Sequence, residues 1–201
     1  MGDKFNTMIT KFRIFESHKD IYEICKKYNI LDYVINDDMT ITVYSDNYST
    51  GNVYLTDSNS GKIPIKFKKV SGHFNCSHLN LNSMEGSPDY IGGNFYCNDN
   101  DLTSLEYLPS SALSYYLKNN KITNFYGLPE FFEKYIDLRG NPVEEILRLF
   151  NRNPMCMDLI REYDVIQGDE VIGVRLEEVY AELGEIPPII RDLEFENYIL
   201  I

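Results

Sequence analysis

The sequence has no tryptophan, only three histidines, and fewer basic than acidic residues. Its 201 residues include 31 Asp and Glu against 19 Lys and Arg, which gives a formal net charge of −12. An acidic chain lacks the basic surface that electrostatic binding of nucleic acid requires, so we expect no nucleic-acid partner. No Ser/His/Asp convergence and no phosphate-binding glycine loop are recognisable. We therefore expect a non-enzymatic protein without a cofactor.

Long hydrophobic runs are also missing. No stretch approaches the roughly 18 apolar residues that would cross a membrane, so we expect no membrane partner. Residues 1–16 mix charged and single apolar residues and lack the apolar core of a signal peptide. The four cysteines form neither a CxxC motif nor a dense disulfide framework. These absences predict a reducing, cytoplasmic location.

What the sequence does contain is a repeat with a period near 21 residues. A shift by this distance aligns Gly72 with Gly93, Phe74 with Phe95, Cys76 with Cys97, Leu81 with Leu102, and Pro88 with Pro109. Further shifts of 20 or 21 residues extend the alignment, so about five units run from Gly51 to Ile146. A fixed period of this length is typical of stacked repeat proteins, or solenoids.

Each unit has a physical interpretation. Phe95 and Cys97 alternate with polar residues, so both side chains are predicted to point inward from a short strand. Asn100 follows the strand and is predicted to turn inward, where its amide would bond the backbone of neighbouring coils. Leu102 is expected to follow it into the core. Stacked units would then share one continuous core and one parallel sheet.

The motif Phe95-x-Cys97-x-x-Asn100-x-Leu102-x-x-Leu105-x-x-x-Pro109 resembles a leucine-rich repeat of the short bacterial type. The longer stretch from Pro64 to Pro109 resembles repeat proteins encoded by large tailed bacteriophages. The resemblance implies an α/β repeat solenoid, a leucine-rich-repeat arc of about five coils. It would carry a parallel sheet on its concave side and helices at both ends, and it would act in an infected bacterial host.

Three regions are expected. Residues 1–50 form an N-terminal helical and strand cap, residues 51–146 form the repeat array, and residues 147–201 form an acidic helical C-terminal cap. Within it, residues 151–201 hold 12 acidic residues against 4 arginines and no lysine. Its final apolar residues, Tyr198 to Ile201, are expected to dock onto the cap rather than remain exposed.

Strand alternation predicts an outward-facing surface on the concave side. Tyrosine gives rigid, amphipathic contact area and is enriched at interface cores, so this surface is interpreted as a protein-binding site. The alternative is that tyrosine simply packs well on strands in a tyrosine-rich chain. The candidate partner-binding residues are Tyr54, Asn75, Asn94, Tyr96, Asn98, Tyr116, Lys118, Tyr135, Asp137 and Arg139.

Two clusters raise the question of metal binding. Cys76 and Cys97 would lie on adjacent coils with His78 nearby, but both thiols should face the core, so core packing is favoured over a disulfide or a metal site. Asp99, near Asp101 and Glu106, lacks the regular spacing of a calcium loop, so a solvated turn is favoured there. We therefore expect no metal.

The predicted function is a protein–protein interaction module that binds an unknown partner on its concave face. One alternative is a structural virion or assembly component that self-associates. Another is an acidic decoy that acts through the C-terminal region. The identity of the partner does not follow from the sequence.

Overall fold

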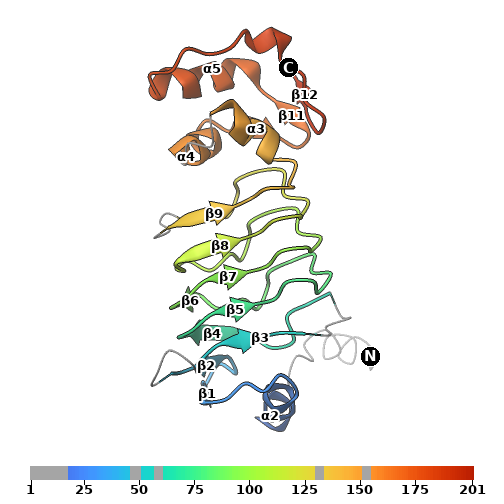
Figure 1. The fold of residues 1–201 in the computed structure, drawn as a ribbon, viewed down its shortest axis with the longest axis vertical. Coiled ribbons are helices and arrows are strands. Elements are labelled where there is room, and N and C mark those ends of the chain that lie inside the picture. The colour runs from blue at the N-terminus through green and yellow to red at the C-terminus, as the bar shows by residue number, and fades with distance from the viewer. Residues whose placement is uncertain (1–17, 46–50, 57–60, 130–133, 151–154) are drawn as a thin grey trace, which may run out of the picture.

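The fold was determined from a computed structural model, which describes residues 18–45, 51–56, 61–129, 134–150 and 155–201. The other parts of the predicted N-terminal cap, residues 1–17 and 46–50, lie outside the described residues. Successive turns of the chain stack along the long axis of the molecule, with a helix at one end and three helices at the other (Figure 1).

The first sheet is five-stranded and entirely parallel. Its strand pairs join Val53 to Phe74, Phe74 to Phe95, Phe95 to Tyr115, and Tyr115 to Ile136. These partners are 20 or 21 residues apart, which is the spacing of the sequence repeat. The strands, in spatial order, are β3 (Val53–Tyr54), β5 (Phe74–Asn75), β7 (Phe95–Tyr96), β8 (Ser114–Tyr116) and β9 (Tyr135–Asp137).

A second sheet has four strands and mixed direction. Its first pair is antiparallel, while the other two pairs are parallel. Tyr90 also forms an isolated parallel bridge with Ser111 in the next coil. The strands, in spatial order, are β1 (Tyr33–Ile35), β2 (Ile41–Val43), β4 (Phe67–Val70) and β6 (Tyr90–Ile91).

The third sheet lies in the C-terminal region, where one antiparallel pair and one parallel pair share a central strand. It consists of β10 (Ile166–Gln167), β11 (Glu170–Val171) and β12 (Ile199–Leu200). The helices of the described part of the chain are α2 (His18–Lys27), α3 (Glu144–Leu149), α4 (Met155–Glu162) and α5 (Gly173–Glu182), with a 3₁₀ turn at Ile190–Asp192.

The predicted fold class, an α/β leucine-rich-repeat arc with one parallel sheet on its concave side, is wrong. Strands occur on both sides of the shared core, and two of the three sheets mix parallel with antiparallel pairs. The physical reason lies in the return path of each unit. Pro88 and Pro109 are buried there, and proline disfavours helix, so short extended segments fill the return path.

The core is formed by aromatic and aliphatic side chains that recur from coil to coil. Phe74 and Phe95 stack at 6.0 Å between ring centroids, and Phe67 of the second sheet meets Phe74 edge-on at 4.9 Å. Tyr115 is fully buried, and its hydroxyl donates to Pro109 O at 2.8 Å. Burial raises the pKa of Tyr115 to about 12, so this donor stays protonated.

Both ends of the core are covered. The expected N-terminal helix is present as α2, which buries Ile21 and Cys25. At the other end, the last helix begins only at Gly173, because Glu170 and Val171 pair as β11. The predicted docking of the C-terminal tail is confirmed only for Tyr198, which is buried and whose hydroxyl donates to Thr123 O at 2.5 Å. Ile199 and Ile201 remain 57% and 59% exposed.

Candidate functional site: a tyrosine face

One row of predicted partner-binding residues runs across the outward face of the five-stranded sheet. Tyr54, Asn75, Tyr96, Tyr116 and Asp137 are direct neighbours in strand register. Tyr54 is 52% exposed, whereas Asp137 is only 6% exposed. We call the outward surface of β3, β5, β7, β8 and β9 the tyrosine face.

Three tyrosines and one histidine form a continuous aromatic strip on this face. The rings of Tyr96 and Tyr116 stack at 4.6 Å with an interplanar angle of 16°. Tyr135 meets Tyr116 edge-on at 5.3 Å, and His73 meets Tyr96 at 6.0 Å. Asn75 separates Tyr54 from this strip in the register. The aromatic strip is therefore His73, Tyr96, Tyr116 and Tyr135.

His73 was not among the predicted binding residues, and its contacts explain its position. Asn52 Oδ1 accepts a hydrogen bond from His73 N at 2.7 Å, and His73 Nδ1 accepts one from Asn94 N at 2.9 Å. An accepting Nδ1 requires a neutral ring with its proton on Nε2. Asn94 Nδ2 then donates to the Tyr96 hydroxyl at 2.9 Å. The 21-residue alignment of His73 with Asn94 was the signal that could have found it.

The asparagine and serine side chains beside the strip bond the strand backbones. Asn75 Oδ1 accepts from Ser77 N at 2.9 Å, and Asn98 Oδ1 accepts from Lys118 N at 3.0 Å. Ser77 Oγ in turn accepts from Asn98 N at 3.1 Å. These oxygens hold the backbone, so the groups that Asn75 and Asn98 can offer a partner are their amide NH₂ donors.

Asp137 and Arg139 are joined to each other. Arg139 donates from Nε at 2.8 Å and from Nη2 at 2.6 Å to the two carboxylate oxygens of Asp137. These hydrogen bonds hold the pKa of Asp137 below its usual value. The buried Asp137 was expected to contact a partner directly, but its carboxylate orients Arg139 instead. Lys118 and the exposed Arg139 are the predicted residues that bring positive charge to this end of the face.

Tyr135 also affects the hydroxyl of Tyr116. The neighbouring Tyr135 side chain raises the pKa of Tyr116 above its usual value, so the Tyr116 phenol keeps its proton. The edge-on ring contact fixes Tyr135 relative to Tyr116. Tyr135 remains 45% exposed, so it projects from an ordered aromatic base.

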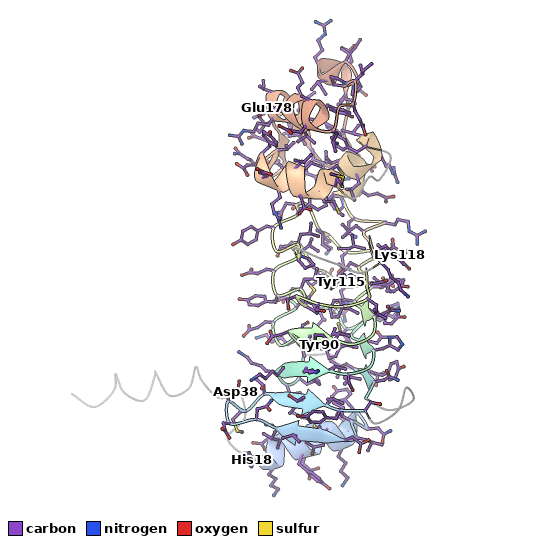
Figure 2. The ribbon with its side chains drawn as sticks, turned by 90° about the vertical axis from the view of Figure 1, so that its left-hand side faces the viewer. His18, Asp38, Tyr90, Tyr115, Lys118 and Glu178 are labelled. Carbon is purple, nitrogen blue, oxygen red and sulfur yellow. The ribbon has the colours of Figure 1, made fainter. Side chains whose placement is uncertain are left out.

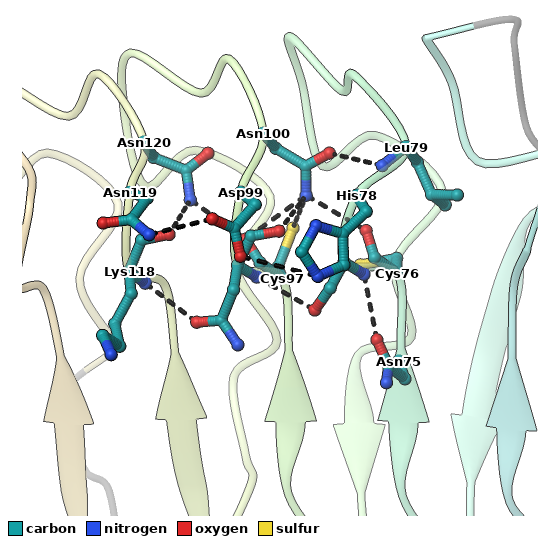
Figure 3. A network of polar contacts seen from close by, with 12 residues as sticks. Asn75, Cys76, His78, Leu79, Cys97, Asp99, Asn100, Lys118, Asn119 and Asn120 are labelled. Atoms are coloured by element: carbon teal, nitrogen blue, oxygen red, sulfur yellow. Dashed lines mark hydrogen bonds and ion pairs between the residues drawn. The ribbon is translucent and has the colours of Figure 1, made fainter.

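Inward-facing asparagines hold the strands of the tyrosine face in register (Figure 3). Asn100 Oδ1 accepts from Leu79 N and Leu81 N, both at 3.0 Å, and its Nδ2 donates to Cys76 O at 3.0 Å. Asn120 repeats the pattern one coil later, with Leu102 N as donor at 3.1 Å. The predicted inward asparagine is confirmed.

A third asparagine completes the ladder. Asn141 Oδ1 accepts from Ile122 N at 3.0 Å, and its Nδ2 donates to Leu117 O at 2.8 Å and Leu138 O at 2.9 Å. We call Asn100, Asn120 and Asn141 the asparagine ladder. Because the ladder satisfies buried backbone groups behind the sheet, it fixes the platform on which the aromatic strip lies.

The cysteine cluster forms part of the core. Cys76 and Cys97 are buried free thiols, and Cys76 Sγ donates to Tyr96 O at 3.4 Å. Burial raises the pKa of Cys76 well above its usual value. His78 instead turns to Asp99, with 3.6 Å between Nε2 and Oδ2. Among the described residues, no group of His, Cys, Asp or Glu is arranged to hold a metal ion.

Within the ranges that the structure covers, no helix is both long enough and apolar enough to cross a membrane.

Comparisons with known proteins give little further guidance. No protein-family model matches the chain, and no solved structure matches it. One similar protein is PHD finger protein 10 of Xenopus laevis, which is 24% identical over 144 residues. The matched region is 69% of this chain but 26% of that protein, so the chain spans about a quarter of the relative's length.

Proposed function

We propose that this protein binds another protein through the tyrosine face. The observation that carries the proposal is the aromatic strip, in which Tyr96, Tyr116 and Tyr135 touch one another on the outward side of a parallel sheet. Rings already ordered by their neighbours lose little conformational freedom when a partner arrives. An ordered row of tyrosines is therefore well suited to serve as an interface core.

The ring geometry favours a protein partner over stacked bases. Tyr96 and Tyr116 already cover part of each other's ring faces, as their 16° stack at 4.6 Å shows. Their edges and hydroxyls are the parts that a partner meets. Single-stranded nucleic acid instead uses open aromatic faces together with a positively charged groove, and the chain as a whole carries a net charge of −12.

The size of the face sets the scale of the complex. Four gaps of about 4.8 Å between the five strands give a face about 19 Å long. Two gaps of about 7 Å between three successive outward-facing residues along a strand give a width of about 14 Å. The resulting area of roughly 270 Å² is below the about 800 Å² per partner of a standard interface. The tyrosine face would thus form the centre of a larger contact, with its rim supplied by residues beside it.

The setting of this interaction is also a proposal. The resemblance of residues 64–109 to repeat proteins of tailed bacteriophages supports a role in an infected bacterial cell. Under this proposal the protein acts by occupying a host or phage protein and catalyses no reaction. Lys118 and Arg139 would favour a partner with acidic groups opposite β8 and β9.

A capture experiment with matched variants tests the proposal. Tagged wild-type protein, the Tyr96→Ala/Tyr116→Ala variant and the Tyr22→Ser/Tyr126→Ser control are expressed in bacteria, and bound proteins are quantified by mass spectrometry. Tyr22 and Tyr126 are 54% and 69% exposed and lie off the tyrosine face, so the control removes the same number of tyrosines. We expect one stoichiometric partner with the wild type and the control, and its loss from the face variant.

Two results of this experiment would contradict the proposal. A partner that stays bound to the face variant would place the contact elsewhere, with the acidic C-terminal region as the next candidate. A defined oligomer with no second protein, measured by light scattering, would favour self-association instead. Thermal unfolding of each variant shows whether loss of binding reflects loss of folding.

A further inference from the structure

Tyr107 has a left-handed backbone conformation, and the residues at the equivalent position in the two adjacent coils are both glycine. Gly86, Tyr107 and Gly127 follow one another at 20- or 21-residue intervals, with φ of +98°, +64° and +89°. An L-residue with a side chain is strained in this left-handed region, whereas glycine is not. Tyr107 therefore costs stability at a position where the adjacent coils avoid that cost.

The Tyr107 side chain makes no polar or aromatic contact in the described structure that would offset this strain. It is 54% exposed. Among the described residues, its ring and hydroxyl make no aromatic contact, cation–π contact or hydrogen bond. Backbone strain with no compensating contact inside the fold is typical of sites where a side chain is positioned for a ligand.

Tyr107 lies at the border of a hollow of about 290 Å³ on the side of the second sheet. This hollow is far from the tyrosine face, since Asp38 in its wall and Lys118 on that face lie at opposite sides of the molecule (Figure 2). Ser87 also lines it.

The charges in the wall are of both signs and closely spaced. Asp38, Glu85 and Asp89 line the hollow together with Lys66 and Lys68. Lys66 Nζ lies 3.3 Å from Glu85 Oε1. An anion or a cation in the hollow would meet charges of its own sign at short range. A ligand that suits all of these groups must both donate and accept hydrogen bonds without a charge of its own.

We propose that this hollow binds a neutral saccharide. A sugar hydroxyl donates to a carboxylate and accepts from an ammonium group, so one type of ligand group suits both Asp89 and Lys68. The apolar C–H face of the sugar packs on the ring of Tyr107. The site is independent of the tyrosine face and does not depend on the proposed protein partner.

Saturation-transfer NMR with maltotriose, chitotriose and lactose, each at millimolar concentration, tests the proposal. We expect at least one of the three to bind wild-type protein, with a dissociation constant that changes less than twofold between 50 and 500 mM NaCl, because a neutral ligand has no charge to screen. Tyr107→Gly should weaken binding at least tenfold. Tyr126→Ser, which changes an exposed tyrosine outside this hollow, should bind as wild type does.

Thermal unfolding separates a ligand role from a structural one. Glycine suits the φ of +64° at position 107, so Tyr107→Gly should unfold at the same temperature as wild type or higher. A lower unfolding temperature would show that Tyr107 stabilises the fold and would contradict the argument from strain. Absence of binding by all three sugars, or equal binding by wild type and Tyr107→Gly, would overturn the proposal.

Discussion

The asparagine ladder shows how single side chains join one coil to the next. Asn120 accepts from Leu102 N and donates to Cys97 O, so one amide satisfies the backbones of two different coils. The repeat predicted this role because asparagine recurs directly after the strand. No comparable signal marked the pairing of Asp137 with Arg139, which were both predicted as partner-binding residues.

Asn120→Ala should be strongly destabilising. It leaves buried backbone groups of Leu102 and Cys97 without their partner, and each such loss costs about 1–3 kcal/mol. We expect the free energy of unfolding in urea to fall by about 2–4 kcal/mol. Asn119→Gly is the matched control, because exposed Asn119 has a φ of +53° that glycine accepts. A loss below about 1 kcal/mol for Asn120→Ala would show that the ladder does not hold the coils.

The Asp137–Arg139 pair predicts a dependence on pH. The folded pKa of Asp137 is lowered, so its stabilisation is present above the unfolded pKa and is lost as the pH falls through the folded value. Asp137→Asn should lower the free energy of unfolding by about 1–2 kcal/mol at pH 7, a range that allows for the exposure of Arg139. The difference from wild type should shrink as the pH falls through the folded pKa of Asp137, which lies below its usual value. A difference that stays equal throughout an acid titration of the folded protein would assign the effect to shape instead of charge.

At the scale of elements, the N-terminal helix and the strands of the repeat were predictable, whereas the pairing of the second sheet was not. The expected helix is α2, and the expected short strand at Phe95 is β7. The strands of the second sheet have two to four residues, and β2 is buried at all three positions, so its burial does not alternate. Their partners are set by the return path of each coil, which depends on contacts between units rather than on local pattern.

The docked C-terminal tail gives a prediction at this scale. Tyr198 joins β12 to the repeat region through its bond to Thr123 O, and its ring lies edge-on to Phe195 at 6.2 Å. Tyr198→Phe removes one hydrogen bond and should lower the free energy of unfolding by about 1 kcal/mol. Tyr198→Ala also removes the buried ring and should lower it by about 3–5 kcal/mol.

The two Tyr198 variants also report on how the tail is attached. Limited proteolysis should cut residues 184–201 faster in Tyr198→Ala than in Tyr198→Phe, because only the former loses the packing that anchors β12. Equal cleavage rates for wild type and Tyr198→Ala would mean that β12 is held by its backbone pairing with β11 alone.

At the scale of the whole molecule, an acidic chain presents two unlike surfaces. The tyrosine face lies on the five-stranded sheet, with Lys118 and Arg139 near its C-terminal end. The hollow beside Tyr107 lies on the opposite side. The rows of the tyrosine face followed from strand alternation. Only the three-dimensional structure shows the ring contacts that join Tyr96, Tyr116 and Tyr135. It also shows the ring contact between His73 and Tyr96.

The most direct test of the central claim is the dissociation constant of the captured partner, measured by calorimetry with purified proteins. For the Tyr96→Ala/Tyr116→Ala variant we predict binding at least 100-fold weaker than wild type, which corresponds to about 2.7 kcal/mol. The Tyr22→Ser/Tyr126→Ser control should stay within about threefold of wild type, consistent with the near-neutral cost of residues outside an interface. A face variant that remains folded and binds as tightly as wild type would contradict the assignment of the tyrosine face as the binding surface.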